Sequence, residues 1–322
     1  MIVTVTANPA VDKRLVISGF RAGGMNRATV ERVDIGGKGI NVARNLARLG
    51  CDVLATGFVA AVGTRDLTAT LGADGVHHDF VQVPGEVRTN LKILDPAVGL
   101  ETEINESGPM VAPDAIATLT DKVRVLAREC QVMVFSGSLP PGVPEDLYAQ
   151  FIRLASAAGV RTVLDTAGVA LEHGIAATPD IVKPNRVESE ALLRVQIRDD
   201  SDVAAAARQI LDLGARTAVI SLSAEGAVGA SRNGMWRARP PRIATRRTVG
   251  AGDAMVAALA YGLQCSFPLA HALRFASALA SAAAASAAPL PVPGRMETLL
   301  PQVAIESLTP DGVRIGFPGM DR

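Results

Sequence analysis

Short strand-like segments alternate with helical segments along most of this chain, and this alternation restricts the folds that it can adopt. The strand-like segments are almost wholly apolar, as expected for strands covered on both faces: Ile2 to Thr6, Val53 to Val59, Val132 to Phe135 and Ala218 to Leu222. Helical periodicity occurs at about 113–130, 144–158 and 203–213. Repeated strand–helix–strand units give parallel strands with right-handed crossovers. We therefore predict an α/β fold with a mostly parallel central sheet.

Composition limits the class of protein and its partners. The 322 residues suffice for one large α/β domain, and no linker or repeat divides them. The chain has 32 basic and 32 acidic side chains, which argues against a nucleic-acid or membrane partner. Cys51, Cys130 and Cys265 lie far apart without metal-type spacing, as in a reducing compartment. Because no basic region followed by a long apolar run opens the chain, we expect a cytoplasmic protein.

The glycine-rich segment from Thr248 to Met255 runs into an alanine-rich helical segment. Small side chains at Gly250, Ala251 and Gly252 let a phosphate approach the free N–H groups of the helix start, where the macrodipole also favours negative charge. A carboxylate at an anion site repels phosphate unless it takes part in the reaction. Asp253 is suited to take the proton from a hydroxyl that attacks the phosphate. The alternative is that Asp253 only stabilises the helix dipole.

A second glycine-rich segment, Ile35 to Arg44, opens another predicted helix. It is not a Walker nucleotide-binding loop, because glycine follows Lys38 where serine or threonine is required and the first glycine of that motif is missing. The glycines let a ligand come close, and Lys38 and Asn41 project from the helix start. The segment therefore favours an oxygen-rich small molecule.

Two separated parts of the chain, at about 12–35 and 87–106, have the alternating patterns of half-exposed strands. We expect them to form a small β flap that stands off the main sheet. Asp12, just past the first strand, either holds sugar hydroxyls or is a turn aspartate. Arg88 is either a bidentate phosphate clamp or an ordinary strand-end arginine.

Two further loops follow predicted strands. Ser136 to Gly142 is a small-residue loop on the side where ligands bind in open α/β sheets. At Lys183 to Glu188 a strand ends and a helix begins, with Asn185 and Glu188 on one helix face. This pair either positions a hydrated Mg²⁺, or consists of the helix N-cap and its capping-box partner.

Four motifs stand in a fixed order, and together they resemble the PfkB (ribokinase-like) family of sugar kinases. They are Gly36 to Ala43, Ser136 to Gly142, Lys183 to Glu188 and Thr248 to Asp253, within a similarity that runs from Asn8 to about Ala288. The resemblance implies a single domain over residues 1–322, a three-layer ribokinase-like sandwich with a small β-sheet lid. It also implies a homodimer through the lid, Mg²⁺-ATP as donor, and transfer of the γ-phosphoryl to a sugar-phosphate hydroxyl.

The same resemblance implies roles for the residues that match the family's motifs. Asp253 looks like the catalytic base, and Gly250, Ala251 and Gly252 like the anion hole for the γ-phosphate. The implied sugar-phosphate site comprises Asp12, Arg27, Gly37, Lys38, Asn41, Arg88 and Ser138. The implied nucleotide contacts are Lys183, Asn185, Ser221, Leu222, Ser223, Ala224, Glu225, Gly226 and Gly252. Asn185 and Glu188 resemble the pair that positions the metal through water.

The resemblance is greatest to the branch with 1-phosphofructokinases and tagatose-6-phosphate kinases, through Arg88 to Lys92 and Thr102 to Asn105. It implies fructose 1-phosphate as the acceptor. The alternatives are tagatose 6-phosphate, fructose 6-phosphate, an unphosphorylated sugar or nucleoside, and a sensor without catalysis. Three places depart from the family's pattern: Ser223 replaces a usual glycine beside the nucleotide, Phe58 to Gly63 lacks a usual glycine pair near the sugar pocket, and Ala254 replaces a common serine.

Overall fold

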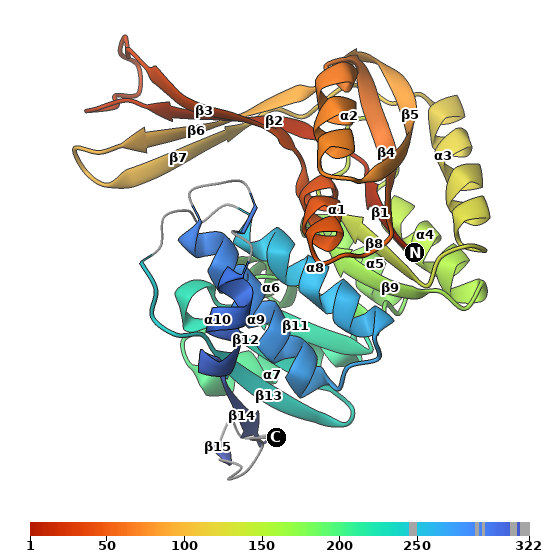
Figure 1. Ribbon diagram of the computed structural model, residues 1–322, viewed down its shortest axis with the longest axis vertical. Coiled ribbons are helices and arrows are strands. Elements are labelled where there is room, and N and C mark those ends of the chain that lie inside the picture. The colour runs from red at the N-terminus through yellow and green to blue at the C-terminus, as the bar shows by residue number, and fades with distance from the viewer. Residues whose placement is uncertain (245–249, 287–289, 292–293, 310–313, 316–322) are drawn as a thin grey trace.

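The structure is a computed structural model that describes residues 1–244, 250–286, 290–291, 294–309 and 314–315. The chain forms a large sheet covered by helices, from which a smaller sheet projects (Figure 1). The strands are β1 Ile2–Thr6, β2 Ala10–Val16, β3 Thr29–Gly36, β4 Val53–Val62, β5 His77–Glu86, β6 Arg88–Asp95, β7 Leu100–Asn105, β8 Val132–Ser136, β9 Arg161–Asp165, β10 Ile181–Val182, β11 Thr217–Ser221, β12 Ala227–Ser231, β13 Gly234–Arg239, β14 Ala304–Leu308 and β15 Arg314–Ile315. The helices are α1 Lys38–Arg48, α2 Thr64–Ala73, α3 Pro113–Leu126, α4 Leu147–Ala157, α5 Gly168–Ala176, α6 Arg186–Leu193, α7 Asp200–Asp212, α8 Ala251–Gln264, α9 Leu269–Ala285 and α10 Arg295–Leu299, with 3-10 turns η1 Ser223–Glu225 and η2 Leu300–Gln302.

The large sheet has 11 strands in the order β15-β14-β13-β12-β11-β10-β9-β8-β1-β4-β5. From β11 to β5 every neighbouring pair is parallel. Strands β12 to β15 extend one edge as antiparallel neighbours. The predicted mostly parallel α/β fold is confirmed. Strands β14 and β15 lie in the C-terminal part of the chain, where no element was predicted.

Two hydrophobic cores lie on opposite faces of the large sheet. Within β1, Val3 and Val5 belong to one core and Ile2 to the other, because successive side chains of a strand point to opposite faces. Helices α3, α4, α5 and α7 bury their apolar sides in the first core, and α1, α2, α8 and α9 in the second. The protein is therefore the three-layer sandwich that the resemblance implied. Within the described ranges, no helix combines the length and apolar composition needed to cross a membrane.

The small sheet has 4 strands in the order β3-β2-β6-β7. The outer pairs, β2 with β3 and β6 with β7, are antiparallel, and the central pair β2 and β6 is parallel. The two segments predicted to form a flap thus pair with each other, with Ala10 opposite Arg88 at the start of β2 and β6. That this sheet acts as a lid stays a prediction.

The order of the strands reverses at β1. From β1 the chain continues to β4 and β5 on one side, and only later to β8 and β9 on the other. Ligand crevices in open α/β sheets form at the carboxyl ends of strands where the order reverses in this way. The small sheet also leaves the molecule here, because β2 begins at Ala10, shortly after β1 ends at Thr6. The fold therefore points to the ends of β1 and β8 as the place for a site.

Candidate active site

Helix α8 begins with a first turn in which Ala251 is half-buried, Gly252 is exposed and Asp253 is buried. Its N-cap Gly250 has φ 89° and ψ −13°, a left-handed conformation that glycine adopts without strain, and no side chain of the described residues caps the helix. A Cβ atom built on Gly252 would meet no atom within 4 Å. Among the described residues nothing covers Gly252, and the role of this helix start as an anion hole stays a prediction. Thr248 and Val249, the start of that motif, lie outside the described residues.

Asp253 is the third residue of α8, and its side chain is buried against α1. Asn41 donates a hydrogen bond from Nδ2 to Asp253 Oδ2 across 2.9 Å. Burial raises the pKa of Asp253 to about 6, although the positive charge of Lys38 acts in the opposite direction. A carboxyl group whose pKa lies close to neutral pH, and whose position is fixed by an amide donor, is suited to accept a proton.

The start of α1 packs tightly against the end of β1. Gly37, the N-cap, has φ 129°, and a Cβ atom on Gly39 would lie 2.4 Å from Thr6 Oγ1. These two positions therefore require glycine, which brings Lys38 and Asn41 to the end of the sheet. Lys38 is half-exposed, with Nζ 3.3 Å from Asp165 Oδ1.

Asp165, at the carboxyl end of β9, joins the parts of the site and was not among the predicted site residues. Its Oδ1 lies 3.3 Å from Lys38 Nζ and 3.2 Å from Lys183 Nζ, and Ser136 Oγ donates to its Oδ2 across 3.2 Å. Burial favours the neutral acid, but the charges of Lys183 and Lys38 outweigh it and hold the pKa of Asp165 below its usual value. The sequence signal that could have identified Asp165 as a site residue is a carboxylate at the end of a predicted strand, the same feature that singled out Asp12.

Asn185 and Glu188 form a complete capping box at the start of α6. Asn185 Oδ1 accepts from the main-chain N–H of Glu188 at 2.8 Å, and Glu188 Oε2 accepts from the N–H of Asn185 at 2.8 Å. The capping alternative is therefore confirmed. The other carboxylate oxygen, Glu188 Oε1, lies 3.9 Å from Lys38 Nζ and so faces the site. The metal role of this pair stays a prediction.

The predicted nucleotide-side residues gather at the ends of β10 and β11. Asn185 and Ser221 form a parallel bridge, and Lys183 is buried beside Asp165. The turn that follows is closed by a bond from Leu222 N–H to Gly226 O, at 2.8 Å. Within that turn Ala224 is exposed, and Glu225 pairs with Arg186 at 2.7 Å, which ties the turn to α6.

Ser223 has φ 52°, in the left-handed region where a side chain is disfavoured. This gives a physical reason for the glycine that the family pattern has at this position. Gly226, at the end of the same turn, cannot be replaced, because its Cβ would lie 2.1 Å from Ala238 O.

Two of the predicted sugar-phosphate residues, Arg88 and Ser138, contact Asn8 at the base of the small sheet. Asn8 Nδ2 donates to Ser138 Oγ at 3.3 Å, and Arg88 donates to the main-chain oxygens of Asn8 at 3.3 Å and Glu106 at 3.0 Å. Asp12 Oδ1 accepts from Asn90 Nδ2 at 3.0 Å. The structure thus brings Asp12, Arg88 and Ser138 to the same end of the sheet as Lys38.

Arg27 does not join this group within one chain. It lies exposed before β3, at the end of that strand remote from Gly36. Because an extended strand rises about 3.3 Å per residue, the length of β3 separates Arg27 from the start of α1 by roughly 25 Å. The predicted role of Arg27 therefore has no geometric support within a single copy of the chain.

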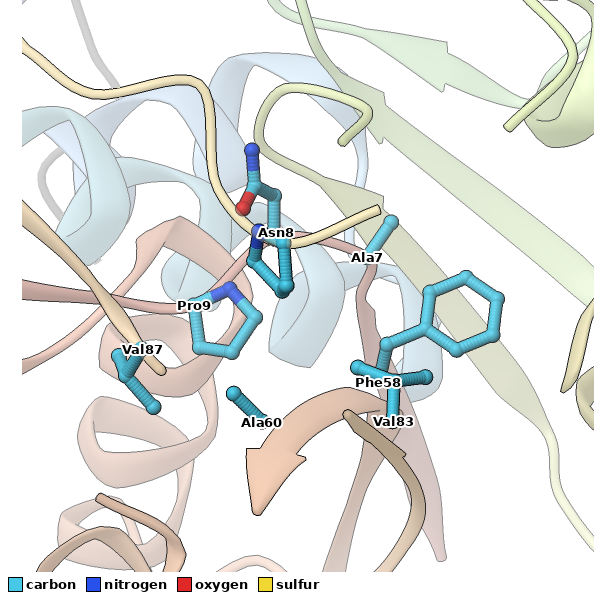
Figure 2. Close-up of a pocket in the computed structure, with 8 residues that line it drawn as sticks. Ala7, Asn8, Pro9, Phe58, Ala60, Val83 and Val87 are labelled. Atoms are coloured by element: carbon cyan, nitrogen blue, oxygen red, sulfur yellow. The ribbon is translucent and has the colours of Figure 1, made fainter. Parts of the chain in front are cut away.

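A small hollow lies beside this site and is lined mainly by apolar side chains (Figure 2). Pro9, Ala60 and Val87 gather on one side of it and Phe58 and Val83 on the other. Neither Lys38 nor Asp253 lines it. A phosphate needs cations or N–H donors, so this hollow is not the place for a sugar phosphate.

A model of the pfkB family carbohydrate kinases matches residues 5–290. The chain belongs to this family. The match covers every motif on which the resemblance was based, so the predicted family is confirmed. The geometry above is consequently that of a pfkB-family kinase, and its remaining residue roles can be proposed in that setting.

Relatives of this pfkB-family chain include named enzymes and solved structures. A 1-phosphofructokinase from Rhodobacter capsulatus is 38% identical over 96% of this chain and 98% of its own. A tagatose-6-phosphate kinase from Staphylococcus epidermidis is 33% identical over 82% of this chain and 85% of its own. The structure of phosphofructokinase-2 from Escherichia coli in complex with substrates and products superposes with a TM-score of 0.85 at 30% identity, covering 94% of this chain and 98% of that one.

Proposed function

We propose that this chain transfers the γ-phosphoryl group of ATP to a hydroxyl of a ketohexose phosphate, with fructose 1-phosphate as the acceptor. The observation that supports this most directly is the hydrogen bond from Asn41 to the buried carboxylate of Asp253. It fixes a proton acceptor beside the uncapped N–H groups of α8. A base next to an anion site is what phosphoryl transfer to a hydroxyl requires.

Asp253 takes the proton of the attacking hydroxyl in this proposal. With a pKa of about 6, its carboxylate is mostly unprotonated at neutral pH and still basic enough to accept a proton. The N–H groups contributed by Gly250, Ala251 and Gly252 bind the γ-phosphate oxygens, and Lys38 supplies a positive charge near the transferred group. Because phosphoryl transfer depends mainly on positioning and charge neutralisation, these groups suffice to define the reaction centre.

The described residues fit Mg²⁺ that arrives with the nucleotide. Mg²⁺ usually takes one or two carboxylates and keeps several waters or substrate phosphates as ligands. Glu188 has one oxygen directed to the site, and we infer that it holds the ion with Asn185, through water. No cluster of three His, Cys, Asp or Glu side chains occurs within the described ranges, so the phosphates would supply further ligands. When bound, the ion neutralises phosphate charge.

Two observations favour a phosphorylated ketohexose, and fructose 1-phosphate in particular. Lys38 acts electrostatically on Asp253 and Arg88 bonds Asn8 at the base of the small sheet, so the proposed sugar side has two cations that an unphosphorylated sugar would not require. Relatives covering most of the chain are named 1-phosphofructokinase, at 38% and 40% identity, and tagatose-6-phosphate kinase, at 33%. A ketohexose 1-phosphate and a ketohexose 6-phosphate would occupy such a site in opposite orientations. Tagatose 6-phosphate and fructose 6-phosphate are therefore the substrates that compete with fructose 1-phosphate in this proposal.

We also propose that two copies associate through the small sheets. Register places Val33, Lys13, Leu91 and Ile104 in one row on one face, and Asp34, Asp12, Asn90 and Asn105 in the next row on the other. The first face exposes apolar surface, with Val33 53% and Ile104 49% exposed. Covering it with a second copy removes that surface from water.

Sedimentation of the purified protein tests this association. Wild type should sediment as a dimer, and Ile104→Glu should shift it toward monomer. Asn105→Glu, on the opposite face, serves as the control and should leave the dimer intact. A monomeric wild type would contradict the proposal.

The reaction itself is tested by ADP release from Mg²⁺-ATP with fructose 1-phosphate, fructose 6-phosphate or tagatose 6-phosphate. We expect turnover to be fastest with fructose 1-phosphate, and we expect Asp253→Ala to lower kcat by about 10²–10⁴-fold, the usual effect of losing a general base. A faster rate with another acceptor would reassign the substrate. ATP binding without turnover on any of them would favour the alternative of a sensor on the same fold.

A further inference from the structure

The strands β1 and β8 separate at the point where the strand order reverses. They pair in parallel from Ile2 opposite Val132 to Val5 opposite Phe135, and the pairing stops there. Beyond it, the main-chain N–H of Ala7 and the carbonyl of Ser136 have left the β1–β8 ladder. Buried main-chain groups need partners, so something must replace the missing ladder at this gap.

The hydroxyl of Tyr148 occupies that position. Tyr148 is the second residue of α4, is wholly buried and packs its ring 6.1 Å, centroid to centroid, from Phe135. The hydroxyl donates to Ser136 O across 3.2 Å and lies beside the main-chain N–H of Ala7. Burial holds the pKa of Tyr148 above its ordinary value, so the group remains a donor at neutral pH. One side-chain atom therefore links the ends of both strands.

This link continues into the groups of the candidate site. Ser136 donates from Oγ to Asp165, which holds Lys38 and Lys183. A second connection crosses the same gap nearer the surface, from Asn8 Nδ2 to Ser138 Oγ at 3.3 Å. Asn8 directly follows Ala7, and Ser138 lies two residues after Ser136, so the distance between Ala7 and Ser136 also determines the distance between Asn8 and Ser138.

We propose that the Tyr148 hydroxyl is a positioning group that sets the distance between the carboxyl ends of β1 and β8, and with it the geometry of the sugar-phosphate side of the site. Tyr148 does not touch the reacting atoms. It acts through Asn8 and Ser138, whereas within the described residues no direct hydrogen bond joins Tyr148 to the nucleotide side at the ends of β10 and β11. This inference rests on the proposed sugar-phosphate kinase function.

Tyr148→Phe is the decisive variant, because it removes one oxygen and keeps the ring. The chain has 2 tyrosines, and Tyr261→Phe is the matched control, because its hydroxyl lies beside Cys265 near the far end of α8. Steady-state kinetics on both variants should show KM for the sugar phosphate raised roughly tenfold in Tyr148→Phe, with KM for ATP within about twofold of wild type, because the lost bond lies on the sugar side. Tyr261→Phe should match wild type in both constants.

Amide hydrogen exchange at Ala7, measured without substrate, gives a second readout. Exchange should be faster in Tyr148→Phe than in wild type or Tyr261→Phe, because the N–H loses the oxygen that lies beside it. An unchanged sugar-phosphate KM, an equal rise in both KM values, or a Tyr148→Phe protein that does not fold would each overturn the proposal. If wild type has no activity on sugar phosphates, the proposed function fails, and the exchange at Ala7 then decides separately whether Tyr148 joins the two strands.

Discussion

The amide of Asn41 donates a hydrogen bond to the carboxylate of Asp253 across 2.9 Å, although 212 positions separate the two residues in the chain. The bond joins the first turns of α1 and α8, which lie side by side on one face of the large sheet (Figure 1). Two glycine-rich motifs, each ambiguous when considered alone, thus meet at one carboxylate. Their meeting favours the base over the dipole alternative for Asp253, because a dipole partner needs no amide donor from another helix.

The raised pKa of Asp253 predicts a specific effect on stability. The pKa of Asp253 in the folded protein is about 6, against an ordinary value of 3.8, so its contribution to stability is fully present below about pH 4 and is lost as pH rises through 6. Asp253→Asn removes this penalty. At pH above 7 we expect Asp253→Asn to be more stable than wild type by about 2–3 kcal/mol, with no gain below pH 4. Urea unfolding at several pH values measures this, and a less stable variant at pH 7.5 would contradict it.

Removal of the Asn41 amide should make Asp253 a poorer base at low pH. The Asn41 bond lowers the pKa of Asp253 against the larger effect of burial, so Asn41→Leu should raise that pKa further. We expect the acid limb of the kcat/KM profile to move to higher pH than in wild type. The phosphate of the acceptor titrates equally with both proteins, so the difference between the two profiles reports a change in the pKa of a group on the enzyme. Coincident acid limbs would show that the bond does not tune Asp253.

The elements could be predicted well from the sequence because each depends on local patterns. The apolar runs became β1, β4, β8 and β11, and the alternating segments paired as β6 with β7. Asp165 was missed for the opposite reason. Its importance comes from Lys38, 127 residues away, and from Lys183, and neither spacing has a sequence signature. The exposed position of Arg27 likewise depends on how far β3 carries it from the site.

Asp165 should be a major source of stability because it pairs with a buried cation. Lys183 is only 4% exposed, and Asp165→Asn leaves its charge without a carboxylate partner. Breaking one side of a buried ion pair costs about 3–5 kcal/mol, so we expect a loss of roughly that size. Asp121→Asn, in an exposed pair with Arg124, is the control and should change stability by less than about 1 kcal/mol. Equal effects of the two substitutions in thermal unfolding would disprove the buried-pair interpretation.

Ser223→Gly should stabilise the turn beside the nucleotide. Ser223 holds φ 52°, and a glycine there removes the clash of the Cβ with the backbone, which is worth about 0.5–1 kcal/mol. Thr178→Gly, at φ 60°, offers the same backbone change at the end of α5. Both variants should melt higher than wild type, and only Ser223→Gly should alter KM for ATP. If neither variant changed KM for ATP, the turn at Ser223 would have no part in nucleotide binding.

Glu188→Gln separates the two functions that Glu188 combines. Glutamine can replace glutamate in a capping box, because its side-chain oxygen still accepts from the Asn185 N–H, so the stability of α6 should stay within about 0.5 kcal/mol of wild type. It lacks the negative charge that a magnesium ligand supplies, so the Mg²⁺ concentration for half-maximal rate should rise about tenfold or more. Glu188→Ala removes both functions and should also lower the melting temperature. Mg²⁺ titration of the rate beside thermal unfolding distinguishes the cases, and an unchanged Mg²⁺ requirement in Glu188→Gln would leave Glu188 as a helix cap alone.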